Sequence, residues 1–309
     1  MDQPTLDLLR RTRTRGRQPL SGLSVEQARR FPSWYELLFG PAPRLAVMRD
    51  VRIPANDGTP LHARLYVDQP EADSLVVYFH GGGWVLGSVA AFEPCTALLA
   101  RRTGAAVLSV DYRLAPEHPF PTPVLDADAA LRFAAESAPS LLGRPLRRLV
   151  AMGDSAGATL ATVATRRLAR DASARSPDLQ VLVYPVTDAG FDTPSYQQYA
   201  EGHLLSADDM HWFWDHYCPD PARRADPDAS PLRTPDLSGL PTTLLYTAEL
   251  DPLRDEGERY GLRLQQAGVD CRMLRCPGVL HSFLAMANVL PLAASAFDTL
   301  CRDMREQLA

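Results

Sequence analysis

The sequence predicts an α/β protein with a mostly parallel sheet and helices on both of its faces. The main observation is that short β-rich runs alternate with helical stretches over most of the chain. A second is the turn signal Asn56-Asp57-Gly58, which indicates an antiparallel hairpin where the sheet begins. A third is the size of the chain: 309 residues with 46% hydrophobic content can bury one large core, with or without an inserted cap.

The predicted elements follow in order from this hairpin. Two alternating segments between residues 47 and 67 flank the turn and give the first two strands. The six further β-rich runs are Leu75–Phe79, Ala105–Val110, Arg148–Met152, Leu179–Val183, Thr242–Thr247 and Cys271–Leu274. The helical stretches include Pro94–Arg102, Val124–Ala135, Ala156–Ala169 and Arg254–Gln266. Together these elements predict an eight-stranded sheet.

Two regions interrupt the alternation, and we interpret both as cap material. The first, residues 1–46, is polar and contains the aromatic residues Trp34, Tyr35 and Phe39. The second, residues 188–235, has a helix start at Ser206-Ala207-Asp208-Asp209, followed by aromatic residues and a proline-rich exit. The predicted domains are an N-terminal part of the cap (1–46), a first core part (47–187), a cap insertion (188–235) and a second core part (236–309).

Composition limits the partners that we expect. The net charge of −5 is too small and too mixed for nucleic-acid binding or for docking to an anionic membrane, so small molecules are the expected partners. No stretch approaches the ~18 uninterrupted apolar residues that span a bilayer, and the basic N-terminal run is followed by no apolar segment typical of an export signal. Five sparse cysteines fit reduced thiols. We therefore expect a soluble, cytoplasmic protein.

A candidate nucleophile lies in the run Gly153-Asp154-Ser155-Ala156-Gly157, which follows a predicted strand and opens a helical stretch. The two glycines leave room for a tight strand-to-helix turn that would expose the hydroxyl of Ser155. The pentapeptide alone is equally compatible with an ordinary βα loop. Its interpretation therefore depends on the other residues that a reactive serine needs.

A serine hydroxyl is a weak nucleophile that needs a base and an acid to orient that base. His281 follows the run 271–274 and the loop 275–280, so we predict it as the base at the carboxyl edge of the sheet. Asp251 follows the run Thr242–Thr247 and precedes Pro252, and we predict it as the orienting acid. The alternative for Asp251 is a helix cap alone.

The developing oxyanion also needs hydrogen-bond donors. His80-Gly81-Gly82-Gly83-Trp84 follows the run Leu75–Phe79 and offers backbone N–H groups without side chains in the way. We predict Gly82 and Gly83 as donors, with His80 in a structural role. The N–H of Ala156, at the start of a helix, is the third predicted donor.

These motifs resemble the hormone-sensitive-lipase family of α/β-hydrolases, esterases with an HGGG motif upstream of GDSAG. The chain order serine, aspartate, histidine is that of α/β-hydrolases and differs from the orders in chymotrypsin-like and subtilisin-like enzymes. Asp111–Pro121 and Asp251–Gly257 also match the family pattern, so the resemblance covers nearly the whole chain.

The resemblance implies an α/β-hydrolase fold with a helical cap, frequent dimerisation, and activity on short acyl esters without metal or cofactor. It implies nucleophile, acid and base at Ser155, Asp251 and His281, and oxyanion donors at the positions of Gly82, Gly83 and Ala156. Ala158 and Ser282 stand where the family often has glycine, which leaves substrate choice open. Candidates for the substrate pocket are Trp84, Leu205, Trp212, Phe213 and Trp214, although the aromatic residues could simply pack the cap onto the core.

Together the residues and the resemblance predict a serine carboxylic-ester hydrolase for short to medium acyl esters. Two alternatives keep the acyl-serine: an acyltransferase, and a deacetylase for one specific metabolite. A peptidase is a further alternative. A receptor that only binds a small molecule is the alternative without catalysis, and the presence of His281 argues against it. Cys271 and Cys276 lack a second cysteine pair at ligand spacing, so no metal site is expected.

Overall fold

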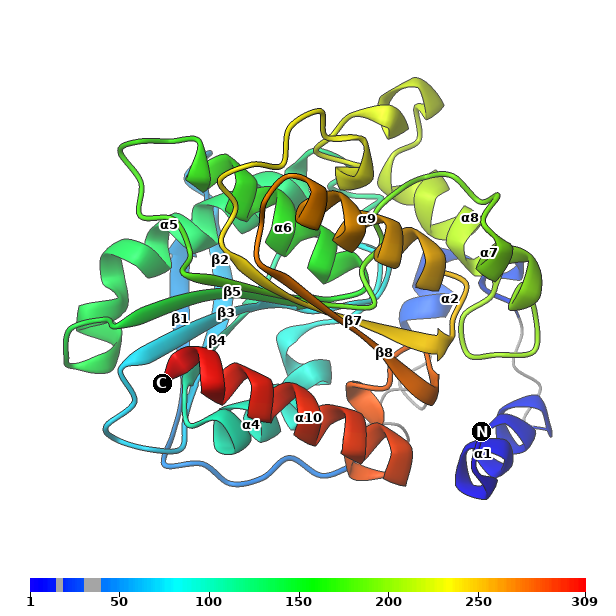
Figure 1. Cartoon of the computed structure of the whole chain (residues 1–309), viewed down its shortest axis with the longest axis horizontal. Helices are drawn as coiled ribbons and strands as arrows, with labels where there is room; N and C mark the ends of the chain where they lie inside the picture. The colour runs from blue at the N-terminus through cyan, green and yellow to red at the C-terminus, as the bar shows by residue number, and fades with distance from the viewer. Residues whose placement is uncertain (15–18, 31–39) are drawn as a thin grey trace.

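The computed structural model describes residues 1–14, 19–30 and 40–309 (Figure 1). Its described strands form one eight-stranded sheet in the order β1-β2-β4-β3-β5-β6-β7-β8. The strands are Val47–Pro54 (β1), Pro60–Val67 (β2), Ser74–Phe79 (β3), Ala106–Asp111 (β4), Arg148–Asp154 (β5), Leu179–Val183 (β6), Thr242–Leu250 (β7) and Cys271–Leu280 (β8). β2 is antiparallel to both of its neighbours, and the other pairs are parallel. The predicted, mostly parallel sheet is confirmed.

The antiparallel edge is the hairpin that the sequence predicts. β1 and β2 pair along their whole length. In the turn Gly58 has φ +82°, which glycine adopts without steric cost. Asp57 accepts hydrogen bonds from the N–H of Thr59 at 3.0 Å and from the Arg113 guanidinium at 2.6 Å. The turn is therefore held to the segment that follows β4.

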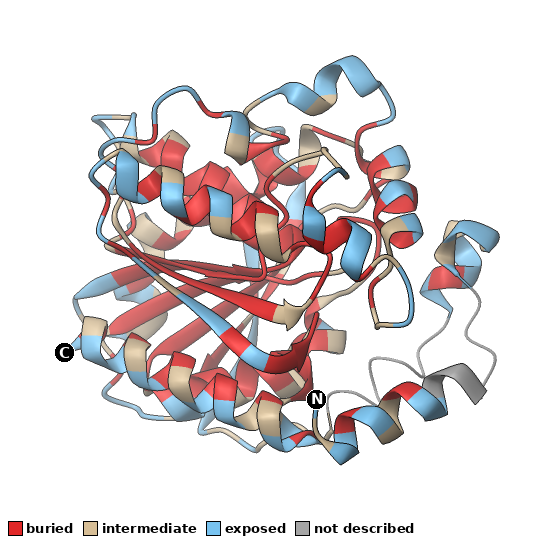
Figure 2. Ribbon diagram, turned by 45° about the vertical axis from the view of Figure 1, so that its right-hand side comes forward, coloured by how far each residue is buried: buried red, intermediate tan, exposed pale blue. Residues whose placement is uncertain are grey.

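Helices cover both faces of the sheet (Figure 1). α4 (Val89–Thr103) and α10 (Pro291–Leu308) lie on one face, and α5 (Thr122–Leu142), α6 (Ala156–Ala169) and α9 (Arg254–Gln266) lie on the other. Side chains of β3 alternate between the two cores: Val77 and Phe79 join the core with α5, α6 and α9, while Val76 and Tyr78 join the core with α4 and α10. Figure 2 shows the central strands buried between these layers. Within the described residues, no helix has the length and apolar character needed to cross a bilayer.

One predicted strand end is wrong, and it affects the site. The sequence predicts a strand that ends at Leu274 and then a loop, whereas β8 continues to Leu280. The strand continues because its pairing with β7 resumes after an irregularity at Ala248 and reaches Leu280. Pro277 is accommodated because β8 is an edge strand, where a missing N–H leaves no ladder bond unmade.

The helices α4 and α5 are longer than predicted. α4 starts at Val89, because the hydroxyl of Ser88 caps it by accepting the N–H of Ala91 at 3.0 Å. α5 continues to Leu142 and ends at Gly143, which has the left-handed conformation typical of a helix C-terminus. Local propensity alone places such ends poorly, because tertiary packing extends a helix beyond its periodic apolar residues.

The first part of the insertion 188–235 lies at the end of the sheet toward which β7 and β8 point, and its last part packs against α6 and α9 (Figure 1). The insertion contains α7 (Pro194–Gln198), α8 (Ala207–Tyr217) and the short helices η2 (Pro221–Ala225) and η3 (Pro231–Arg233). The predicted start of α8 is confirmed. Ser206 accepts the N–H of Asp209 at 3.0 Å, and Asp209 accepts the N–H of Ser206 at 3.1 Å, a capping box.

The described N-terminal residues contact this insertion and the core. They form α1 (Gln3–Thr14), η1 (Leu20–Gly22) and α2 (Val25–Arg29). The N–H of Leu20 donates to Asp209 at 3.1 Å, and Arg29 donates to the carbonyl of Val85 at 3.0 Å and to Glu117 at 2.6 Å. The aromatic residues Trp34, Tyr35 and Phe39 lie outside the described residues, and the division of the chain into cap and core parts stays a prediction.

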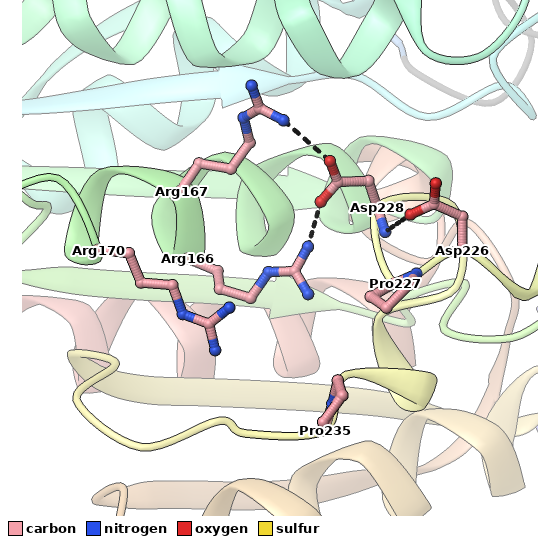
Figure 3. Close-up of a pocket in the computed structure, with 7 residues that line it drawn as sticks. All are labelled: Arg166, Arg167, Arg170, Asp226, Pro227, Asp228 and Pro235. Carbon is pink, nitrogen blue, oxygen red and sulfur yellow. Dashed lines mark hydrogen bonds and ion pairs between the residues drawn. The ribbon is translucent and has the colours of Figure 1, made fainter.

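A partly buried group of ion pairs holds the return of the insertion to the core (Figure 3). Asp228 accepts hydrogen bonds from Arg166 and Arg167 of α6, and Arg166 also donates to the hydroxyl of Thr234 at 2.6 Å. A cavity of about 310 Å³ lies beside these pairs. Arg166 is about three turns of α6 beyond Ser155, or roughly 16 Å along the helix, so the cavity is separate from the candidate nucleophile.

Replacing Asp228 with alanine is expected to lower the free energy of unfolding by about 3 kcal/mol, because it leaves the Arg166 guanidinium buried without its counter-charge. Urea denaturation measures the change. Asp215→Ala is the matched control: Asp215 pairs with Arg224 in the same insertion, but its side chain is 68% exposed, so the expected loss is below about 1 kcal/mol. Equal losses for the two variants would contradict the prediction.

Candidate active site

The turn between β5 and α6 presents Ser155 at the carboxyl edge of the sheet. Ser155 has φ +54° and ψ −123°, a conformation that is costly for a residue with a side chain. Its N–H donates to the carbonyl of Val183 at 2.9 Å, and its carbonyl accepts the N–H of Ala158 at 3.0 Å. These bonds to β6 and to α6 hold the residue in the sharp turn that exposes a nucleophile.

Two glycines make this turn sterically feasible. A Cβ atom on Gly153 would collide with the backbone of Gly157, and a Cβ atom on Gly157 would collide with the carbonyl oxygen of Phe79. The first turn of α6 therefore packs directly on the ends of β3 and β5. The sequence reasoning that assigned these glycines to a tight turn and a close helix agrees with this geometry.

His281 lies next to Ser155, although the two residues are 126 positions apart. Its Nε2 atom is 3.0 Å from the Ser155 hydroxyl oxygen. The residue follows β8 directly, because that strand continues to Leu280. Both side chains are largely buried, with 6% of each residue exposed. Their separation is a hydrogen-bond distance, which a general base needs.

Asp251 completes a hydrogen-bonded line behind His281. One carboxylate oxygen is 2.7 Å from Nδ1 of His281, and the other accepts the N–H of Leu253 at 2.9 Å. Asp251 is fully buried. Its carboxylate therefore makes both contacts that the sequence suggested as alternatives, one to the imidazole and one to the backbone that leads into α9.

The bonds of His281 assign its tautomer. A carboxylate accepts hydrogen bonds, so the proton of the neutral imidazole belongs on Nδ1, facing Asp251. Nε2 is then free to accept the hydroxyl proton of Ser155. This arrangement can remove a proton from the serine as it attacks an electrophile.

The glycine loop after β3 lies at the same edge of the sheet. Gly82 has φ +113° and Gly83 has φ +60°. The carbonyl of Gly82 accepts the N–H groups of Val85 and Leu86 at 3.1 and 2.8 Å, which closes the loop. Together with Ala156 at the N-terminus of α6, the loop brings the three predicted oxyanion donors to the elbow region; their catalytic role stays a prediction.

His80 holds this loop through ring stacking and hydrogen bonds. Its ring is stacked on Tyr112, with 4.5 Å between ring centroids, and on Phe92, at 5.3 Å. Its Nδ1 atom is 2.8 Å from the carbonyl oxygen of Gly81, and its own carbonyl accepts the hydroxyl of Tyr112 at 2.8 Å. Burial lowers the pKa of His80 below its usual value, so the ring is neutral near pH 7.

The five pocket candidates are all buried, but their surroundings differ. Trp84 and Trp214 are fully buried; Trp84 is stacked on Tyr217 at 3.9 Å and packs edge-on against Trp214 at 5.1 Å. Phe213 packs against Gly83, since a Cβ atom there would overlap the ring. Leu205 and Trp212 are 7% and 8% exposed. Phe213 thus contacts Gly83 directly, and the pocket roles of all five stay predictions.

Sequence reasoning did not single out two groups beside the site. The ring of Tyr184 lies 4.6 Å from that of His281. The carboxylate of Asp154, which precedes Ser155, accepts the N–H of Gly81 at 2.8 Å. The position of Asp154 inside the serine pentapeptide was a signal for its importance, whereas Tyr184 carries no motif that could have revealed it.

The cysteines offer no alternative nucleophile. All five lie within the described residues, and each is free and buried. Burial raises the pKa of Cys271 and of Cys276 to about 12, so both are thiols near neutral pH. Among the residues that the structure describes, no group of three or more His, Cys, Asp or Glu side chains is arranged to hold a metal ion.

Comparison with known proteins identifies related chains. An ethyl acetate hydrolase of Pseudomonas putida is 38% identical over 295 residues, which cover 94% of this chain and 92% of the relative. Carboxylesterase NlhH of Mycobacterium tuberculosis is 40% identical over 249 residues, 77% of this chain and 76% of the relative.

Solved structures agree with these sequence relatives. An ester hydrolase from the metagenome of Lake Arreo is 34% identical, with a TM-score of 0.92 over 100% of this chain and 99% of the other. A thermostable esterase from Pseudomonas putida is 33% identical, with a TM-score of 0.92 over 100% and 98%. Residues 76–285 match the sequence model of a family described as having the alpha/beta hydrolase fold. The chain therefore belongs to this alpha/beta hydrolase family.

Proposed function

We propose that this chain is a serine carboxylic-ester hydrolase that cleaves esters of short to medium acyl chains through an acyl-enzyme intermediate. The observation that carries the proposal is the hydrogen-bonded line from Asp251 through His281 to Ser155. The glycine loop at the same edge of the sheet supports it. Esterases among the relatives and structural neighbours support the reaction class.

In the first half-reaction, Nε2 of His281 takes the hydroxyl proton of Ser155 while the serine oxygen attacks the ester carbonyl. The imidazole becomes a cation, which the carboxylate of Asp251 stabilises from 2.7 Å. The N–H groups of Gly82, Gly83 and Ala156 donate to the carbonyl oxygen as it becomes negative. The imidazolium then gives its proton to the leaving alcohol.

In the second half-reaction, water enters in place of the alcohol. His281 removes a proton from this water, the resulting oxygen attacks the acyl-serine, and the proton returns to the Ser155 oxygen as the acid leaves. Each proton transfer thus uses the same imidazole. The proposed mechanism needs no metal or cofactor.

One side chain beside the glycine loop, and two more in the insertion, support the proposed acyl size. Phe213 occupies the space next to Gly83, and Leu205 and Trp212 are bulky, buried residues in the same insertion. We therefore propose that short and medium acyl chains fit beside the loop, whereas long chains are excluded.

We further propose that the protein works in the cytoplasm and forms a homodimer. Five free, buried thiols support a reducing compartment. The resemblance to the hormone-sensitive-lipase family, which implies frequent dimerisation, supports the homodimer. Sedimentation equilibrium of the purified chain tests the dimer directly.

Ser155→Ala and His281→Ala are each expected to lower kcat/KM by at least about a thousandfold, because each removes a group that forms or breaks bonds. Release of nitrophenol from nitrophenyl butyrate measures the effect. Ser140→Ala, at an exposed position of α5, is the control and should retain full activity. A wild-type chain that hydrolyses no nitrophenyl ester, or a fully active Ser155→Ala variant, would refute the proposed function.

An acyl-length series tests the proposed substrate range. We expect kcat/KM to be highest among acetate, butyrate and hexanoate esters, and to fall by at least about tenfold for the palmitate ester, because we propose that Phe213 limits the space beside the glycine loop. Competing alcohols in the same assay distinguish hydrolysis from acyl transfer. A preference for palmitate would contradict the proposed range, and a dominant ester product would favour the acyltransferase.

Gly83→Ala tests the loop as an oxyanion donor. The variant is expected to lower kcat by about 100-fold, because a side chain at φ +60° is strained and its Cβ atom would overlap the Phe213 ring, so the N–H moves away. Gly58→Ala is the matched control. Gly58 also has a positive φ, +82°, but lies in open space in the β1–β2 turn, so kcat per folded molecule should not change. Equal kcat values for Gly83→Ala and Gly58→Ala would contradict the assignment of Gly83 as an oxyanion donor.

A further inference from the structure

A buried carboxylate lies directly behind the nucleophile. Asp154 is the last residue of β5, and only 3% of it is exposed. One of its oxygens accepts the hydroxyl of Tyr78 at 2.6 Å and the N–H of Gly81 at 2.8 Å, and the other accepts the hydroxyl of Tyr184 at 3.3 Å. The proposed ester hydrolysis assigns no role to this residue.

The first contact fixes the glycine loop. The N–H of Gly81 opens the segment that carries the proposed donors Gly82 and Gly83, and Asp154 is its hydrogen-bond acceptor. The packing is equally close: a Cβ atom on Gly81 would lie 2.5 Å from the other carboxylate oxygen of Asp154. The carboxylate therefore rests against the loop backbone and determines how close the loop lies to the elbow.

The second contact leads to the base. Tyr184 follows β6 and has φ +37°. Its hydroxyl donates to Asp154, while its ring lies 4.6 Å from the ring of His281 and packs edge-on against Phe283 at 5.1 Å. The same carboxylate thus orients an aromatic ring that lies against the imidazole.

We propose that Asp154 is a positioning residue for the ester hydrolysis proposed above: its carboxylate holds the oxyanion loop through Gly81 and the imidazole of His281 through the ring of Tyr184. One side chain, covalently adjacent to Ser155, then fixes the donors and the base relative to the nucleophile. The inference rests on the proposed function, and its test is designed to fail separately from it.

The charge of Asp154 is part of this role. Burial raises the pKa of Asp154 to about 6, although the hydrogen bonds from Tyr78 and Gly81 act in the opposite direction and lower it. The ionisable groups that face the carboxylate are Tyr78 on β3, Tyr184 after β6, Cys95 on α4 and His281 after β8. His281 is the one that gains a positive charge during the proposed reaction, and a nearby carboxylate favours that cation.

Burial of this charge also has a consequence for stability. The pKa in the folded state, about 6, lies above the ordinary 3.8, so the folded chain binds the proton more tightly than the unfolded chain. Asp154 therefore destabilises the fold increasingly as the pH rises from about 4 to about 6, and the full effect persists above that range. Asp154→Asn, which removes the charge, is expected to raise the melting temperature at about pH 8 while lowering kcat. If Asp154 served only the stability of the fold, the same substitution would lower both the melting temperature and kcat.

The kinetic test compares two variants with the wild type, each normalised to active sites titrated with a fluorophosphonate. Asp154→Ala removes the bond to Gly81, so we expect kcat to fall by about 100-fold while KM changes by less than about threefold. Asp154→Asn resembles the protonated carboxyl. The ratio of wild-type to variant kcat is therefore expected to be about tenfold near pH 8 and to approach one near pH 5, where the wild type is protonated as well.

Two controls separate this role from a general effect of buried polar groups. Asp128→Asn makes the same change at a buried aspartate on α5, bound to Arg132 and Arg167, and its kcat ratio should be near one at both pH values. Tyr78→Phe removes a donor that lowers the pKa of Asp154. The ratio of the kcat of Tyr78→Phe to that of Asp154→Asn should therefore pass the midpoint of its change with pH at a higher pH than the wild-type ratio does. Tyr66→Phe, on β2 and three strands away from β5 in the sheet, should leave that midpoint unchanged.

Wild-type kcat per titrated site in both Asp154 variants, at both pH values, would overturn the proposal. A pH-independent ratio for Asp154→Asn would overturn the part that depends on charge. If the wild type itself released no alcohol from any ester, the proposed function would fail instead, and the two results cannot be confused.

Discussion

The close packing of α6 against the carboxyl ends of β3 and β5 is the constraint on which the rest of the site depends. A Cβ atom at Gly157 would collide with the carbonyl oxygen of Phe79, so any side chain there would push the helix away from the sheet. Ser155 would move with the helix, because its carbonyl bonds to the first turn. The distance of 3.0 Å to His281, and the approach of the glycine loop to the start of α6, both require this contact.

The site also concentrates ionisable groups where water is largely excluded. Asp251, Asp154 and His281 are all buried, and each makes at least two polar or aromatic contacts. In such surroundings charges interact more strongly than at the surface, which favours the imidazolium that the proposed reaction forms. The same burial makes an ionised carboxylate costly to keep, as the raised pKa of Asp154 indicates. Elsewhere, the partly buried ion pairs at Asp228 hold the end of the insertion against α6.

Much of the fold follows from short-range patterns. The hairpin turn at Asn56-Asp57-Gly58, the strand Leu179–Val183 and the helix Arg254–Gln266 have the predicted type and place, because turn chemistry and apolar periodicity act within a few residues. The predicted end of strand β8, at Leu274, was wrong for the opposite reason. Pro277 and its glycine neighbour are typical of a loop, whereas the strand continues through them because it pairs with β7, which is distant in the chain.

By itself, the sequence determined the alternation of strands and helices, the elbow at Ser155, and the order in which nucleophile, acid and base candidates appear. These properties are local, or depend only on which residue follows which strand. The tertiary structure alone decided that Asp251 meets His281 across 30 positions, that Asp154 meets Gly81 across 73, and that Phe213 rests on the glycine loop. Such contacts depend on how the whole sheet twists and packs, and hydrogen bonds change strength over tenths of an ångström, which no sequence spacing specifies.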